Sequence, residues 1–184
     1  MTGVASNPQV VAGAETRRGS PQIKYERHQP LSESLTLEAS HSQERILQTQ
    51  RIIPYGSDAI YAAFSDPARL ALWWGPRDFK NTFQAFEFRT GGAWNYLMHG
   101  PDGQDYPNRS VFRILEDGKK IVIDHISAPR FTLSVSLQPV EGGTQVLWVQ
   151  AFEDPKVAEA VRHIAEPGNE QNLDRLHLHL RGEL

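Results

Sequence analysis

The side chains best suited to chemistry in this sequence are its seven histidines, in a chain that contains no cysteine. The lack of cysteine excludes disulfides, thiolate zinc sites, iron–sulfur clusters and a cysteine nucleophile. Two of the histidines, His177 and His179, are two positions apart in a predicted helix. Because such positions point about 200° apart, the two imidazoles cannot share a metal ion. We therefore expect neither a metal site nor another cofactor.

The histidine best placed to meet a ligand is His125, which shares its strand parity with two isoleucines. A lone imidazole on an apolar strand face could orient a ligand or carry a proton near neutral pH. His177 falls on an apolar helix stripe, where we expect a partly buried, hydrogen-bonded ring, with ligand contact as the alternative. His179 is expected to be solvated, and neither His99 nor His163 shows a partnered acid in the sequence.

The pattern of a serine hydrolase is missing, because no Gly-x-Ser-x-Gly elbow occurs and the serines show no obvious order of histidine and aspartate beside them. Glu87 and Arg89 stand two apart on a predicted strand, which favours a surface ion pair over an acid–base pair. We therefore predict no catalytic residue. A cavity enzyme, such as a cyclase or a hydrolase, is the weakest of the functional hypotheses.

The elements that must position these side chains are expected in the order strand, two short helices, about six strands and a long helix. Residues 45–53 predict the first strand, which ends at Pro54. Ser57 is expected to cap the first helix, and residues 68–74 predict a second helix closed by Gly75-Pro76. Recurring turn signals then indicate an antiparallel meander, with strands at 82–89, 94–98, 110–115, 121–126, 131–137 and 144–152.

Helical spacing returns after Pro155, with a break predicted at Pro167-Gly168. Beyond the break, Leu173, Leu176 and Leu180 form an apolar stripe. A curved antiparallel sheet needs a cover for its apolar face, and this stripe is the available one. The residues expected on the concave face are Trp94, Tyr96, Met98, Phe112, Ile114, Phe131, Leu133, Val146 and Trp148.

Composition divides the chain into a tail and one domain. Residues 1–42 are poor in large apolar side chains, so we expect a disordered N-terminal tail followed by a domain over 43–184. A net charge of −3 without a basic run disfavours nucleic acid as a partner. No apolar run is long enough to span a bilayer and no signal peptide is recognised, so we expect no membrane insertion and a cytoplasmic location.

Several motifs from about residue 45 to 180 resemble one family, the activator of heat-shock protein 90 ATPase homologue-like branch of the START/SRPBCC (Bet v 1-like) superfamily. The matching stretches are Trp73-Trp74-Gly75-Pro76, Glu87-Phe88-Arg89 with Gly91-Gly92-Ala93-Trp94, Tyr106-Pro107-Asn108-Arg109, Lys120-Ile121-Val122, Phe131-Thr132-Leu133 and Leu173-Asp174-Arg175-Leu176. The resemblance implies an α+β helix-grip fold, in which a curved antiparallel sheet of about six to seven strands grips the C-terminal helix around a cavity. Relatives typically follow the glycine at position 168 with tryptophan, whereas this chain has Asn169. This change is expected to alter what fits inside.

Three hypotheses for function follow. The first is a module that binds a small hydrophobic or amphipathic molecule between the sheet and the last helix. The second, implied by the resemblance, is a protein-interaction module whose partner is a chaperone or another protein, and the third is the cavity enzyme. For any one of the aromatic residues, core packing is the more common role, and ligand contact is the alternative. The residues predicted to contact a ligand are Trp74, Trp94, Tyr96, Met98, Phe112, His125, Phe131, Leu133, Trp148, Leu173 and His177.

Overall fold

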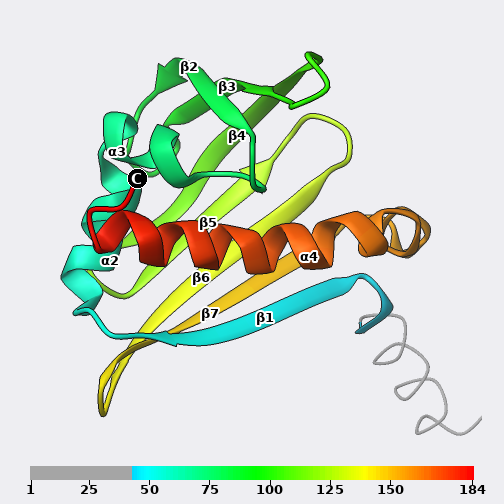
Figure 1. Ribbon diagram of the computed structural model, residues 1–184. Coiled ribbons are helices and arrows are strands. Elements are labelled where there is room, and N and C mark those ends of the chain that lie inside the picture. The colour runs from blue at the N-terminus through cyan, green and yellow to red at the C-terminus, as the bar shows by residue number, and fades with distance from the viewer. Residues whose placement is uncertain (1–42) are drawn as a thin grey trace, which may run out of the picture.

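The computed structural model describes residues 43–184, and Figure 1 shows how their elements are arranged. The predicted tail over 1–42 lies outside the described residues. The elements are β1 (Ile46–Ile53), α2 (Ser57–Ser65), α3 (Pro67–Trp73), β2 (Lys80–Phe86), β3 (Ala93–His99), β4 (Asp105–Glu116), β5 (Lys120–His125), β6 (Phe131–Val140), β7 (Gly143–Phe152) and α4 (Pro155–Leu180). This order confirms the strand, two helices, strands and long helix expected from the sequence.

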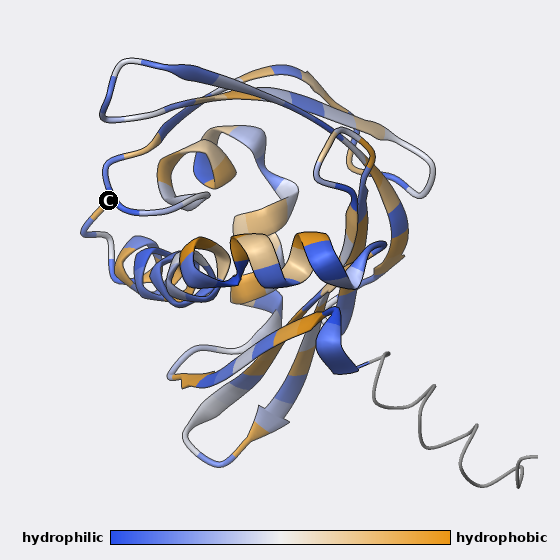
Figure 2. Cartoon of the chain, turned by 90° about the vertical axis from the view of Figure 1, so that its right-hand side faces the viewer, coloured by the Kyte–Doolittle hydropathy of each residue, from blue (hydrophilic) through white to orange (hydrophobic). Residues whose placement is uncertain are grey.

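The seven strands form one antiparallel sheet in the order β1-β7-β6-β5-β4-β3-β2. Figure 2 shows the strands curving around the helices, with apolar and polar residues alternating along them. The long helix α4 crosses the concave side of the sheet, and its C-terminal end lies beside α2 and α3 (Figure 1). The α+β helix-grip fold is therefore confirmed. No helix within 43–184 is both long and apolar enough to cross a membrane.

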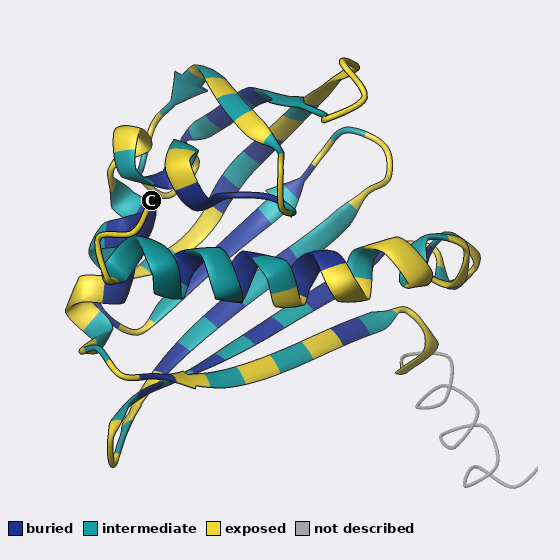
Figure 3. Ribbon diagram, viewed as in Figure 1, coloured by how far each residue is buried: buried dark blue, intermediate teal, exposed yellow. Residues whose placement is uncertain are grey.

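The core lies between the concave sheet face and the helices. Along β7, buried residues alternate with partly exposed ones, as expected for a strand with one covered face. Leu173 and Leu176 of α4 are fully buried in the same cluster as these strand residues, and Figure 3 shows buried and more exposed residues alternating around α4. At the outer edge, Arg51 of β1 forms ion pairs with Glu170 and Asp174 of α4.

A register shift in β4 corrects the predicted concave face. The pairing of β4 with β5 shifts between Phe112 and Ile114, which places a bulge at Arg113. A bulge adds one residue to a strand and reverses the inward and outward alternation beyond it. Ile114 is therefore 36% exposed, and Leu115 packs against the core in its place. The expectation for Ile114 was wrong for this reason.

Two expectations about helix ends are also wrong. The residue before α2 is Gly56, and no side chain caps this helix, whereas Asp66 caps α3 by accepting from the amide of Ala68 at 2.8 Å. The long helix α4 is a single helix that includes Pro167, although its first turns run in a different direction from the rest (Figures 1 and 2). Proline removes one intrahelical hydrogen bond, but the following turn is fixed by buried residues that begin at Gly168, which packs close to Pro76.

Candidate functional site

An open cavity of about 190 Å³ lies between the concave face of the sheet and the middle of α4. Its walls come from the loop after α3, from strands β3, β4, β6 and β7, and from α4. The residues that line it are Trp74, Gly75, Pro76, Tyr96, Met98, Asn108, Phe131, Leu133, Trp148, Gln150, Ile164, Ala165, Gly168, Asn169 and Asn172. We call this the inner cavity.

Two indole rings form the apolar wall of the inner cavity. The rings of Trp74 and Trp148 lie 5.5 Å apart between centroids. Trp74 is held by its indole N–H, which donates to the Tyr96 hydroxyl at 3.1 Å. The chain after Trp74 turns at Gly75, whose φ of +92° favours glycine and whose amide donates to the Asn172 side-chain oxygen at 2.7 Å. The loop is thus fixed to both the sheet and α4.

Buried side-chain amides of the inner cavity are linked to Trp148 by a series of hydrogen bonds. The indole N–H of Trp148 donates to the Asn169 side-chain oxygen at 3.1 Å, and the Asn169 amide nitrogen donates to the Gln150 side-chain oxygen at 3.1 Å. Gln150, Asn169 and Asn172 are all buried. Buried amides are hydrogen-bonded in most proteins, and here each side-chain oxygen has its partner.

The hydroxyl of Tyr96 stays protonated at ordinary pH. Burial raises the pKa of Tyr96 well above its usual value of 10, and the hydrogen bond from Trp74 offsets only part of this effect. A neutral phenol keeps its proton available as a hydrogen-bond donor.

His125 lies at the end of β5, one residue behind the cavity wall. Its ring is 6% exposed and stacks on Phe131 with centroids 4.5 Å apart. Nδ1 is 2.9 Å from the carbonyl of Pro129, which can only accept, so Nδ1 carries a proton. Nε2 of the neutral ring can only accept, and the hydroxyl of Ser127, 3.2 Å away, is the group that can donate to it. His125 therefore supports the cavity wall through the ring of Phe131, which lines the cavity.

The protonation of His125 predicts a pH dependence of stability. Burial lowers the pKa of His125 below its usual 6.5, although the hydrogen bond to Pro129 acts in the opposite direction. The unfolded chain therefore binds more protons than the folded protein as the pH falls below about 6.5, and stability is lost in that window. The pKa of His179 is also lowered, by burial and by Arg69, so it adds a change of the same sign.

We expect the urea midpoint of the wild-type protein to fall between pH 8 and pH 5.5 and to fall less in a His125→Gln variant, because glutamine does not titrate. The carboxylates are common to both proteins and cancel in the comparison. An equal fall in both proteins would show that His125 does not contribute to the pH dependence.

The predicted ligand contacts divide into two groups. The structure places Trp74, Tyr96, Met98, Phe131, Leu133 and Trp148 in the lining of the inner cavity. Trp94, Phe112 and Leu173 are instead fully enclosed in the core, and His125 lies behind the wall. His177 lies outside the lining and meets the ring of Tyr55 edge-on at 6.2 Å.

The lining also contains polar residues that the sequence analysis did not select. Gln150 occupies an inward position of β7, at the same parity as Trp148, and this alternation was a usable signal. Asn169 was noted only as a departure from the family pattern, and Asn172 follows it one helical turn later. Both carry their amides to the buried face of α4.

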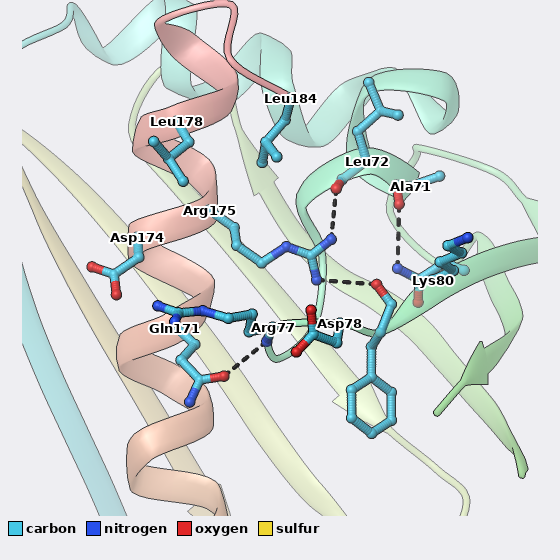
Figure 4. Close-up of a pocket in the computed structure, with 12 residues that line it drawn as sticks. Ala71, Leu72, Arg77, Asp78, Lys80, Gln171, Asp174, Arg175, Leu178 and Leu184 are labelled. Atoms are coloured by element: carbon cyan, nitrogen blue, oxygen red, sulfur yellow. Dashed lines mark hydrogen bonds between the residues drawn. The ribbon is translucent and has the colours of Figure 1, made fainter. Parts of the chain in front are cut away.

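A second and larger hollow, of about 700 Å³, lies on the opposite side of the same loop and is shown in Figure 4. We call it the outer groove. Arg175 of α4 reaches across it and donates to the carbonyl of Leu72 at 2.7 Å and that of Pro76 at 2.6 Å. Further carbonyls of Trp74, Gly75 and Phe79 lie within 3.4 Å of the same guanidinium. Arg175 is therefore committed to holding the loop.

A hydroxyl–imidazole–carboxylate row on the sheet surface corrects one expectation. His99 does have a partnered acid, because its Nδ1 is 2.6 Å from Asp105, and its Nε2 is 2.8 Å from the hydroxyl of Thr82. These residues lie in paired strands, where backbone amides serve the sheet and are not gathered as an oxyanion hole. The row is a polar contact across strands β2, β3 and β4. The predicted surface ion pair of Glu87 and Arg89 is confirmed at 2.7 Å.

The curved sheet, the gripped helix and the cavity between them define a helix-grip domain of the START/SRPBCC superfamily. The family model described as Activator of Hsp90 ATPase homolog 1-like protein matches residues 55–181. The match covers more than half of the chain, and the chain belongs to this family. No curated protein matches the sequence.

Solved structures show the same fold. A protein from Nitrosomonas europaea has a TM-score of 0.70 at 19% identity, over 77% of this chain and 97% of its own. A protein from Arthrobacter aurescens also has a TM-score of 0.70, at 22% identity, over 77% of this chain and 88% of its own. An AHSA1-like protein from Aeromonas hydrophila has a TM-score of 0.59 at 18% identity, over 74% and 92% of the two chains. At these identities the likeness concerns the fold alone.

Proposed function

We propose that the protein is a binding module that holds a small hydrophobic or amphipathic molecule in the inner cavity. The observation that carries the proposal is an open cavity between the sheet and α4 that is lined mainly by apolar side chains, with a few buried amides and one phenol in its wall. Apolar walls with a small number of fixed polar groups are typical of small-molecule sites.

The volume limits the size of the ligand. Drug-sized ligands occupy pockets of about 300–1,000 Å³, whereas an apolar cavity of about 150 Å³ holds a benzene ring. The inner cavity, at about 190 Å³, suits one ring with a short substituent. A long acyl chain or a polycyclic molecule would need the walls to move.

The proposal is tested with a compact aromatic probe, α-methylstyrene, titrated into labelled protein and followed by NMR. We expect saturable shifts of the indole N–H signals of Trp74 and Trp148, because both rings line the cavity. An Ala165→Phe variant places a ring in the lining of the cavity and is expected to weaken binding at least tenfold. An Ala160→Phe variant is the matched control, since Ala160 is exposed on the same helix outside the lining. Absent shifts in the wild-type protein, or equal binding by both variants, would refute the proposal.

The alternative is a protein-interaction module related to chaperone ATPase activators. The observation that favours it is the outer groove, whose edge carries the large apolar side chains of Leu72 and Leu184, 49% and 45% exposed. The two functions are separated by measuring the ATPase rate of purified Hsp90 with and without the protein. Stimulation that is lost in Leu72→Glu and retained in Ala165→Phe would favour the alternative over ligand binding.

A further inference from the structure

We infer that the ligand of the inner cavity is a neutral molecule that carries a hydrogen-bond acceptor, and that the side-chain amide of Gln150 is its principal hydrogen-bond donor, with the Tyr96 hydroxyl as a second. The inference rests on the proposed function and specifies the class of molecule that the same cavity selects. It is carried by the direction of each hydrogen bond in the wall.

Two successive hydrogen bonds, from Trp148 to Asn169 and from Asn169 to Gln150, determine which end of the Gln150 amide faces the cavity. An indole N–H can only donate, so Asn169 must present its oxygen to Trp148. The amide nitrogen of Asn169 then faces Gln150, which must present its own oxygen in return. The Gln150 amide nitrogen is left as a donor, and it has no acceptor among the described residues. Gln150 itself is 8% exposed and lines the cavity.

The hydroxyl of Tyr96 is also left with a free proton to donate. The indole N–H of Trp74 donates to its hydroxyl oxygen, so the phenolic proton must point elsewhere. No acceptor for that proton lies within the described residues, and Tyr96 also lines the cavity. Because burial keeps the phenol protonated, this second group remains a donor rather than an anion.

Three of the four side-chain amide oxygens in the wall already accept a hydrogen bond. The side-chain oxygens of Gln150, Asn169 and Asn172 accept from Asn169, Trp148 and the Gly75 amide respectively. A ligand that brings only donors therefore finds most of the amide oxygens already bonded, whereas a ligand with an acceptor meets the free N–H of Gln150 and the free O–H of Tyr96. The wall selects for acceptors.

The lining also selects for neutral molecules. None of the described residues that line the inner cavity is charged at neutral pH. A carboxylate or an ammonium ion would lose its hydration there without gaining a counter-ion, which costs far more than one hydrogen bond returns. With the volume limit, these conditions point to a compact ring that bears a carbonyl or a similar neutral acceptor.

The test compares molecules of one skeleton. Acetophenone and α-methylstyrene have nearly the same shape, but the first carries a carbonyl oxygen where the second carries a methylene group, and benzoate is the anionic counterpart. We expect acetophenone to bind about tenfold more tightly than α-methylstyrene, the order of one hydrogen bond. Benzoate is expected to bind more weakly than either.

A matched pair of variants on β7 tests whether Gln150 causes the preference for acetophenone over α-methylstyrene. Gln150→Met removes the donor at similar volume and is expected to bring the two dissociation constants within about twofold of each other. Gln145→Met is the control, because Gln145 binds Gln50 at 3.1 Å and lies outside the lining. The affinity for α-methylstyrene reports whether the cavity of Gln150→Met is still intact.

Each outcome separates the inference from the proposed function. A tenfold preference that is lost in Gln150→Met and kept in Gln145→Met supports the inference. Equal affinities in the wild-type protein would overturn it while leaving a ligand-binding cavity in place. If the Gln150→Met variant still prefers acetophenone tenfold, Gln150 is not the principal hydrogen-bond donor and the inference is overturned. Failure of all three probes to bind would overturn the proposed function, and the inference with it.

Discussion

Replacing Leu176 by alanine is expected to lower the free energy of unfolding by about 2–5 kcal/mol, the range for truncating a buried leucine. Leu176 is fully buried in the main core cluster, where the inner side of α4 meets the sheet and α2 and α3. The loss has two parts, the transfer free energy of the removed methyl groups and the cost of the void that the surrounding core fills only in part. The effect is measured as a change in the urea midpoint at constant slope.

Leu178→Ala provides the matched control for Leu176→Ala, since it removes the same atoms two residues further along α4. Leu178 is only partly buried and lines the outer groove, so we expect a loss of less than half as much. Equal losses would contradict the assignment of the buried face of α4.

Helical spacing predicts a solvated His179, but the structure shows this residue partly buried, with its Nε2 accepting from the Nε of Arg69 at 3.3 Å. Its Nδ1 is buried without a partner among the described residues. His179→Ala thus removes one hydrogen bond and one unsatisfied atom together, and we expect a net change within about 0.5 kcal/mol.

Strand parity predicted much of the fold because a sheet with one covered face imposes a strict alternation. Trp148 and Val146 of β7 and Tyr96 of β3 point inward as expected. Parity failed at Arg113, where a bulge reverses it, and no turn residue marks that position. The break expected at Pro167 rested on the proline and not on parity. It is absent because the burial of the next turn of α4 offsets the lost hydrogen bond, and burial is not visible in the local sequence.

The candidate site was predicted in part for a related reason. Trp94 and Phe112 have the correct parity for the concave face, but the rings of Phe83, Phe86 and Phe88 cover them at centroid distances of about 5–6 Å. That cover depends on how β2 and the loop after it close over one end of the sheet. Spacing along a single strand shows which residues point inward, and it does not show which of them another element then buries.

The buried amides were missed because their value depends on contacts between distant segments. Asn169 is one of the polar residues on α4, and only its pairing with Trp148 and Gln150 gives its amide a direction. The family resemblance points to position 169, where relatives typically have tryptophan and this chain has asparagine. An asparagine replaces apolar volume with a directed hydrogen bond, which links this departure to the selectivity inferred for the cavity.

Replacing Arg175 by alanine is expected to lower the free energy of unfolding by about 3 kcal/mol, because hydrogen bonds to a charged group are each worth about 1.5–3 kcal/mol and water in the groove can replace part of them. The guanidinium holds the carbonyls of Leu72 and Pro76 from the side of α4. Arg175→Lys is expected to recover less than half of the loss, since one ammonium group cannot reproduce a planar fork of donors. Arg181→Ala, at an exposed residue beyond α4, is the control and is expected to change stability by less than about 0.5 kcal/mol.

The loop held by Arg175 is shared by both hollows, because Trp74, Gly75 and Pro76 line the inner cavity while residues 77–80 line the outer groove. Arg175→Ala should therefore also speed hydrogen exchange of the Gly75 amide, whose bond to Asn172 depends on the loop staying in place. It should weaken the binding of α-methylstyrene although Arg175 does not touch the cavity. A variant that loses stability but keeps both the Gly75 protection and the probe affinity would show that the two sides of the loop are independent. If stability, protection of the Gly75 amide and affinity for α-methylstyrene are all lost, then Arg175, on the side of the outer groove, supports the wall of the inner cavity.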